Sequence, residues 1–163
     1  MQKDYIMRIV EQFVQAILSI MRCRKNGEYK EAREQVRTAA RYLLRMDIDL
    51  LLWFTDDYLL DHFRDFTNQL DTEKCILGAD LFQELTLIEE AENQTAAADR
   101  LKILCLYLYA TALPKEQQFQ KPEYLKKVAT LIKELKNKPL SEKVQASVRS
   151  YEEFITKMSE MNP

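Results

Sequence analysis

The side chains best suited to catalysis or metal binding are few in this sequence and lie far apart. There is one histidine, His62, and there are three cysteines, Cys23, Cys75 and Cys105. Zinc sites combine Cys and His ligands at short spacings, and a di-iron bundle needs Glu-x-x-His on two helices. Neither pattern occurs, so we expect no metal site. We interpret the cysteines as buried, reduced thiols.

The two glycines bear on phosphate binding. Gly27 and Gly78 stand far apart, whereas P-loops and dinucleotide-binding fingerprints need several glycines within one short segment. We therefore expect no nucleotide site of these kinds and no cofactor. We also predict that the protein is not an enzyme, because apart from His62 the only candidate bases are carboxylates.

Three carboxylates recur every four residues, at Asp57, Asp61 and Asp65. In a helix these residues share one side. Calcium sites take about six to eight oxygen ligands from a flexible loop, and no such loop motif is present. We favour a solvated acidic face over a metal site, and an acidic patch facing a partner is the remaining interpretation.

A basic row has the same spacing in the segment 29–46, and it consists of Arg33, Arg37, Arg41 and Arg45. On a helix these arginines point outward, opposite an apolar stripe. They form either a solvated face, a surface for a protein or a second copy, or a phosphate-binding surface. Glutamates alternate with them, so we expect no nucleic-acid partner.

Two tyrosines, Tyr107 and Tyr109, lie in an otherwise apolar segment. A buried tyrosine hydroxyl needs a hydrogen-bond partner. Both are interpreted as core residues satisfied by backbone or water. The alternative is a small polar pocket near Trp53, Tyr107 and Tyr109, which is where we expect a ligand if one binds.

The segment that must position all these residues is 96–113. It carries no charge from Ile103 to Leu113, and a helix that is apolar on every side must be covered by neighbours. Eleven residues are too few to span a bilayer, which takes about 20. We therefore predict a central core helix and no membrane partner.

The rest of the chain shows amphipathic helical periodicity. We predict helices at 5–24, 29–46, 55–68, 73–91, 123–136 and 141–158, with a helical turn at 47–54 that fills the core and with Phe66 facing inward. The fold class is all-α, with six to seven helices in antiparallel hairpins. We divide the single domain 1–163 into a first hairpin 1–46, an inserted segment 47–70, a second hairpin 71–113 and a third hairpin 121–160.

Composition supports this fold class. The 163 residues include 2 Gly and 4 Pro, with 47% hydrophobic and 31% charged residues, which is typical of one globular, helical domain. Net charge is +3 over residues 1–50, −9 over 51–100 and +4 over 101–163. This alternation of charge along the chain favours electrostatic contacts between segments of one subunit or between subunits. The N-terminal segment mixes charged and apolar residues, unlike a secretory signal, so we expect a cytoplasmic protein.

Two resemblances extend the prediction. Gly27-x-Tyr29-x-x-Ala32, followed by Ala39, resembles the turn and second helix of a tetratricopeptide repeat over about 34 residues. It implies a short, degenerate right-handed stack of helical hairpins. The opening segment Asp4–Phe13 resembles the start of a family of small, uncharacterised bacterial all-helical proteins, which implies the fold and no activity.

The sequence thus predicts a non-catalytic scaffold or adaptor that binds a protein or a second copy through helix faces. The partner surfaces we consider are the arginine row and the aspartate row. The alternative is a small-molecule-binding or regulatory domain that uses the pocket near Trp53.

Overall fold

The computed structural model describes residues 2–161, and this part of the chain is all-α, as the sequence predicts. Residues 2–161 contain eight α-helices and no β-strand. The α-helices are α1 (Gln2–Lys25), α2 (Tyr29–Leu43), α3 (Ile48–Leu51), α4 (Asp56–Leu59), α5 (Thr72–Ala91), α6 (Thr95–Ala112), α7 (Pro122–Glu134) and α8 (Glu142–Met161). Three short 3-10 helices are η1 (Leu60–Phe63), η2 (Leu113–Lys115) and η3 (Gln117–Phe119).

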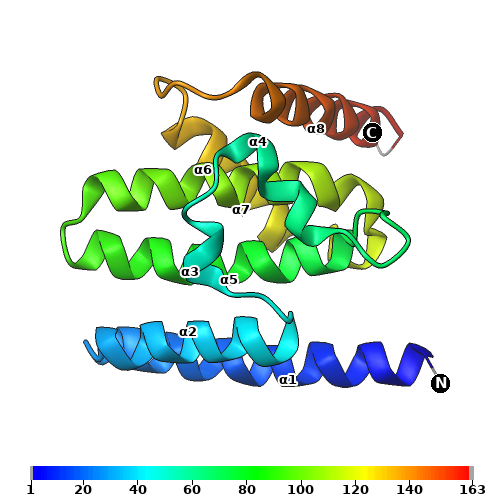
Figure 1. Cartoon of the computed structure of the whole chain (residues 1–163). Coiled ribbons are helices and arrows are strands. Elements are labelled where there is room, and N and C mark those ends of the chain that lie inside the picture. The colour runs from blue at the N-terminus through cyan, green and yellow to red at the C-terminus, as the bar shows by residue number, and fades with distance from the viewer. Residues whose placement is uncertain (1, 162–163) are drawn as a thin grey trace.

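The helices are arranged in layers around the antiparallel pair α5 and α6 (Figure 1). The antiparallel pair α1 and α2 covers α5, and helices α7 and α8 both pack on α6. The segment with α3 and α4 crosses the middle layer, so that α3 contacts α2 and α4 contacts α8. The right-handed stacking of a tetratricopeptide array stays a prediction.

Helix α6 is covered on all sides, and this prediction is confirmed. Every residue from Leu104 to Ala110 is buried, and Leu113 just beyond the helix is fully buried. Helix α5 is buried to a similar extent, although the sequence predicts only one apolar face for it. Its buried residues include the polar Glu84 and Thr86. Among residues 2–161, none of the helices is long and apolar enough to span a bilayer.

From the spacing of apolar residues, the sequence predicts helix ends at Asp4, Gly27, Thr55, Asp71 or Thr72, and Ser141. The structure confirms Gly27, Asp71 and Ser141, whereas Thr55 makes no side-chain capping hydrogen bond and Asp4 lies inside α1. The Asp71 carboxylate caps α5 by accepting a hydrogen bond from the Lys74 amide at 3.0 Å. The Ser141 hydroxyl does the same for α8, accepting from the Val144 amide at 3.3 Å. Gly27 takes a φ of 78° at the end of α1, the left-handed conformation that glycine favours there. These three residues mark the end of α1 and the starts of α5 and α8.

The inserted segment departs from the prediction. The helix expected at 55–68 ends at Phe63, and the chain then forms a loop closed by a bridge between Arg64 and Leu70. The Asp65 carboxylate accepts from the amides of Thr67 and Gln69 at 2.9 and 3.0 Å. A short acidic side chain that accepts hydrogen bonds from nearby backbone amides competes with the hydrogen bonds of a helix. Here the Asp65 carboxylate forms such bonds, and the helix does not continue.

Phe66 and Trp53 of this segment are exposed, although the sequence predicts that they face the core. Phe66 is 101% exposed at the loop, so the prediction that it faces inward is wrong. The turn 47–54 fills the core through Ile48 and Leu51, but Trp53 is 87% exposed. The predicted core filling is therefore correct for two aliphatic residues and wrong for the tryptophan.

One contact anchors the segment on the middle layer. Phe63 is fully buried against Gly78 of α5. A Cβ atom at position 78 would lie 2.7 Å from the Phe63 ring. Gly78 is therefore needed as the one residue that lets this ring approach the α5 backbone.

Candidate interaction groove

The arginine row of α2 is not the outward face that the spacing predicts. Arg33 reaches Glu89 of α5 at 2.9 Å and also pairs with Glu92, and Arg37 reaches Asp49 at 2.8 Å. Arg41 is exposed, whereas Arg45 lies beyond the end of the helix with a φ of 57°. A long arginine side chain can bend toward carboxylates at the edge of its helix, and this bending draws two of the four into contacts with neighbouring elements.

The aspartate row is also not on one helix face. Asp57, Asp61 and Asp65 are exposed, but they lie in α4, η1 and the following loop respectively. Asp61 pairs with Arg64 at 3.3 Å. Hydrogen bonds from Thr67 lower the pKa of Asp65 below its ordinary value. The three carboxylates therefore lie in different elements, and Asp61 and Asp65 make local contacts.

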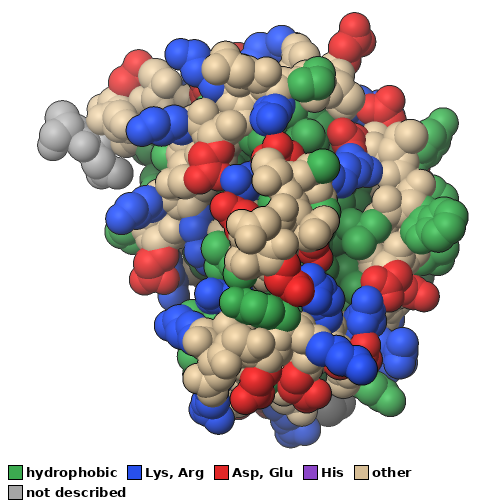
Figure 2. Space-filling model, turned by 90° about the vertical axis from the view of Figure 1, so that its left-hand side faces the viewer, with side chains coloured by type: hydrophobic (Ala, Val, Ile, Leu, Met, Phe, Trp, Pro, Cys, Tyr) green, Lys and Arg blue, Asp and Glu red, His purple; other side chains and the backbone are tan. Residues whose placement is uncertain are grey.

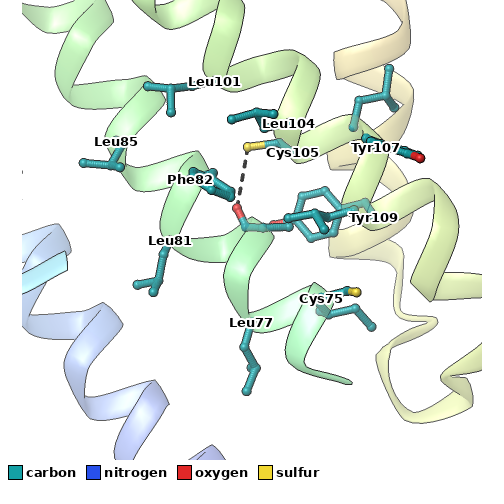
Figure 3. Packing of buried hydrophobic residues seen from close by; sticks show 14 of the residues in the cluster. Cys75, Leu77, Leu81, Phe82, Leu85, Leu101, Leu104, Cys105, Tyr107 and Tyr109 are labelled. Carbon is teal, nitrogen blue, oxygen red and sulfur yellow. Dashed lines mark hydrogen bonds between the residues drawn. The ribbon is translucent and has the colours of Figure 1, made fainter. Parts of the chain in front are cut away.

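The expected pocket near Trp53, Tyr107 and Tyr109 is not built by these side chains. Trp53 lies at the surface, while both tyrosines are buried. Figure 3 shows the two tyrosine rings directed away from each other, as their separation by two residues in a helix requires. The Tyr109 hydroxyl donates to Asp80 at 2.5 Å, whereas Tyr107 lies on the side of Asp57. The three side chains therefore do not converge on one site.

The histidine and the thiols have structural surroundings. The ring of His62 lies 4.5 Å from that of Phe54. The three cysteines are free and buried, as predicted, and the Cys105 thiol donates to the Ala79 carbonyl at 3.6 Å (Figure 3). Burial raises the pKa of Cys75 to about 12. Residues 2–161 contain no cluster of three or more side chains that could hold a metal ion.

Charged side chains of both signs are interspersed over the end of the molecule shown in Figure 2. Lys and Arg side chains alternate there with Asp and Glu, and apolar side chains gather toward the right of the view. A face of this kind offers no continuous basic track for a phosphate backbone.

A groove between helices brings together residues from three layers. Helices α1 and α7 form its walls, α5 forms its floor, and its volume is about 360 Å³. We call this the α1–α5–α7 groove. It is lined by Val10, Phe13, Val14, Ile17, Leu18, Met21, Arg24, Leu77, Asp80, Gln83, Glu84, Leu87, Phe119, Tyr124 and Lys127.

The α1 wall is apolar and open to solvent. Val14 and Leu18 are 48% and 50% exposed, and Met7, in line with them on α1, is 54% exposed. The opposite part of the helix buries Phe13 and Ile20 in the core. Helix α1 thus carries apolar side chains on a wider arc than its packing on α2 and α5 uses.

The floor of the groove carries two carboxylates, Asp80 and Glu84, one helical turn apart on α5. Arg24 of the α1 wall pairs with Glu84 at 2.8 Å, and both side chains are largely buried. Lys127 of the α7 wall lies 3.9 Å from Asp80. Each carboxylate therefore receives a cation from a different wall, and the two pairs tie α1 and α7 to α5.

Asp80 also accepts two hydroxyl hydrogen bonds, from Tyr109 at 2.5 Å and from Tyr124 at 2.8 Å. Burial raises the pKa of Asp80, and the charge of Lys127 and the two hydroxyls oppose that rise. Burial and the charge of Asp80 likewise raise the pKa of Tyr109 and of Tyr124. The hydroxyls remain protonated donors, so this cluster is a fixed polar end of an otherwise apolar groove.

Comparison with known proteins adds nothing to this geometry: no protein-family model, curated protein or solved structure matches the chain.

The groove continues along α5 beyond this cluster. A second depression of about 370 Å³ between α5 and α7 shares Gln83, Leu87 and Lys127 with it. The Gln83 side-chain oxygen is buried at this junction and has no hydrogen-bond partner within residues 2–161. The surface is thus an elongated channel between helices, apolar at its α1 wall and polar along its floor.

Sequence reasoning missed this groove, although part of the signal is present. The spacing assigns to the first helix one apolar stripe, which consists of Ile6, Ile9, Val10, Phe13, Ile17, Ile20 and Met21. Val14 and Leu18 stand outside this stripe, and unassigned apolar residues of this kind indicate a second face. Asp80 has no such signal. Its proximity to Tyr124, 44 residues away, depends on the packing of α7.

Proposed function

We propose that the protein is a non-catalytic interaction module that binds an amphipathic helix in the α1–α5–α7 groove. One observation carries the proposal. Val14 and Leu18 of α1 are half exposed along the wall of a groove, whereas the long helices α2, α5, α6, α7 and α8 leave no Val, Leu or Ile side chain exposed. Apolar surface that lines a concave site and is not used by the core is typical of interaction sites.

The dimensions of the groove favour a helical partner. Its α1 wall extends from Val10 to Arg24, which is about 21 Å, or four turns, at 1.5 Å per residue. A partner helix with apolar residues at spacings of three and four would place them against this wall, as in other helix-in-groove complexes. The polar floor at Asp80 would then fix the orientation of that helix.

The environment of the carboxylates supports a binding role over catalysis. Asp80 and Glu84 already contact cations from the groove walls, so they act in positioning α1 and α7. The three free, buried thiols suit the reducing cytoplasm, where we place this function.

A designed amphipathic peptide of about 18 residues, with leucines at helical spacing, tests the proposal. Added to the isotope-labelled protein, it should shift amide resonances of α1, α5 and α7. Leu18→Glu should weaken binding about tenfold or more, because a charge replaces a central apolar contact. Leu50→Glu is the matched control, since Leu50 is 52% exposed on α3, away from the groove.

Resonance shifts confined to other helices would contradict the proposal. So would equal weakening by the two substitutions, because Leu50 does not line the groove.

A further inference from the structure

We propose that the helix bound at this groove is α1 of a second copy of the chain, packed antiparallel against α1 in a two-fold symmetric dimer. This inference rests on the proposed function and names its partner. It is carried by the arrangement of apolar and charged residues along α1.

A second apolar stripe of α1, outside the one that packs in the core, is suited to pairing with another helix. Met7, Val14 and Leu18 lie within an arc of about 40°, and Val10 and Met21 border the same stripe on the groove side. Residues 7, 14 and 21 follow the seven-residue interval at which paired helices meet. This stripe can therefore serve as a contact surface between two helices. Helix α1 of a second copy carries the same stripe and can cover it.

The N-terminal half of α1 is accessible for such pairing. Helix α1 has 24 residues and α2 has 15, and Figure 1 shows the N-terminal part of α1 running past the end of α2. Met7, in this part, is 54% exposed. A second α1 can lie along the stripe there without displacing α2.

The charges along one edge of the stripe select the antiparallel direction. Glu11 and Arg22 are exposed on the same edge of α1, and neither forms an ion pair in the part of the chain that the structure describes. An antiparallel pairing that puts Val14 opposite Leu18 of the second copy also puts Glu11 close to Arg22 of the second copy. Two-fold symmetry makes each of these contacts twice.

The helix ends agree with this direction. Helix α1 has Asp4 in its first turn and Arg22, Arg24 and Lys25 in its last turn. In an antiparallel pair, the basic end of one α1 lies near the first turn of the other, where Lys3 and Asp4 give no net charge. A parallel pair would instead bring the two basic ends together, which is unfavourable.

The first experiment measures the mass of the purified full chain by sedimentation across concentrations up to about 1 mM, where even weak specific pairs associate. We expect a dimer. Leu18→Glu should give a monomer with the circular dichroism spectrum of the wild type. Gln12→Glu is the matched control and should remain dimeric, since Gln12 is exposed on α1 outside the stripe.

The second experiment tests the direction of pairing by exchanging charges. Glu11→Arg alone and Arg22→Glu alone should each weaken the dimer about tenfold, because like charges then face each other. The double variant should restore the affinity of the wild type. Restoration supports the antiparallel pair, and failure of the double variant to recover overturns it.

The outcomes separate this inference from the proposed function. A wild-type chain that stays monomeric overturns the inference, and peptide binding in the groove would then leave the helix-binding function standing. A monomer that also binds no peptide overturns both. A dimer that survives Leu18→Glu overturns the assignment of the interface to α1.

Discussion

Helices α1 and α6 both carry more apolar residues than a single helix face holds, yet the fold uses them differently. Helix α6 lies in the middle layer, and its neighbours on both sides bury every residue from Leu104 to Ala110. Helix α1 lies in an outer layer, so Val14 and Leu18 remain half exposed beside a groove. Apolar content alone therefore does not tell whether the side chains of a helix form the core or a binding surface. The layer in which the helix lies decides which of its apolar side chains remain exposed.

The largest effect is expected from a charge placed in the middle layer. Leu106 is 1% exposed on α6, and Leu106→Glu would bury a carboxylate without a partner. A loss of about 4–5 kcal/mol or more is expected for such a change, against a total stability of about 5–15 kcal/mol. Thermal melting followed by circular dichroism should lose its cooperative transition, and a melting curve near that of the wild type would contradict the assignment of α6 to the core.

A smaller effect is expected where the inserted segment meets the middle layer. Gly78→Ala would put a Cβ atom 2.7 Å from the Phe63 ring, and overpacking of this kind costs about 1–3 kcal/mol. Urea unfolding should measure that loss. Phe63→Leu in the same chain should recover part of it, and an unchanged urea midpoint for Gly78→Ala alone would show that the ring moves without cost.

The free energy of unfolding should depend on pH through Asp80 on the floor of the groove. Burial raises the pKa of Asp80, so the folded chain holds this proton more tightly than the unfolded chain does. Stability from this group is therefore greatest below the unfolded pKa of about 3.9 and falls as the pH rises toward the folded pKa. Asp80→Asn removes that fall, so the stability of the variant relative to the wild type should increase with pH.

Urea midpoints measured between pH 3 and 7, in about half-unit steps, test this expectation. Asp65→Asn is the opposing control, because hydrogen bonds lower the pKa of Asp65. Its stabilising contribution is present above the unfolded pKa and is lost as the pH falls. The Asp65 variant should therefore lose stability relative to the wild type as the pH rises, and equal trends for both variants would contradict the difference between the two sites.

The smallest effect is expected on the exposed wall of α1. Leu18→Glu should change the free energy of unfolding by about 0.5 kcal/mol or less, as surface substitutions usually do, when measured on the monomer at low concentration. The same substitution at Leu106 then provides the contrast between a leucine that folds the chain and a leucine left for binding. A loss of several kcal/mol at Leu18 would place that residue in the core and remove the contrast.

Much of the fold is predictable from local pattern. The uncharged stretch after Lys102 predicts a covered helix, and Asp71, Ser141 and Gly27 mark helix ends at the positions the structure shows. These features depend on a few neighbouring residues and on backbone chemistry. The inserted segment was less predictable, because the Asp65 carboxylate competes with the helix by capturing backbone donors of the next turn.

The groove was not predictable in the same way. Its α1 wall leaves a trace in the spacing of Val14 and Leu18, but its floor joins Asp80 to Tyr124 and Lys127 of α7. The bending of Arg33 and Arg37 toward α5 and α3 also depends on which carboxylates packing brings near. Helix spacing gives the face on which a side chain begins, and tertiary packing decides where its charged end lies.

The burial of the cysteines has a practical consequence. Cys75 of α5 and Cys105 of α6 are fully buried in the core, and burial keeps both thiols protonated far above neutral pH. An alkylating reagent can react with them only while the core around them is open. The rate of alkylation therefore reports how often the middle of the molecule opens, without any added label.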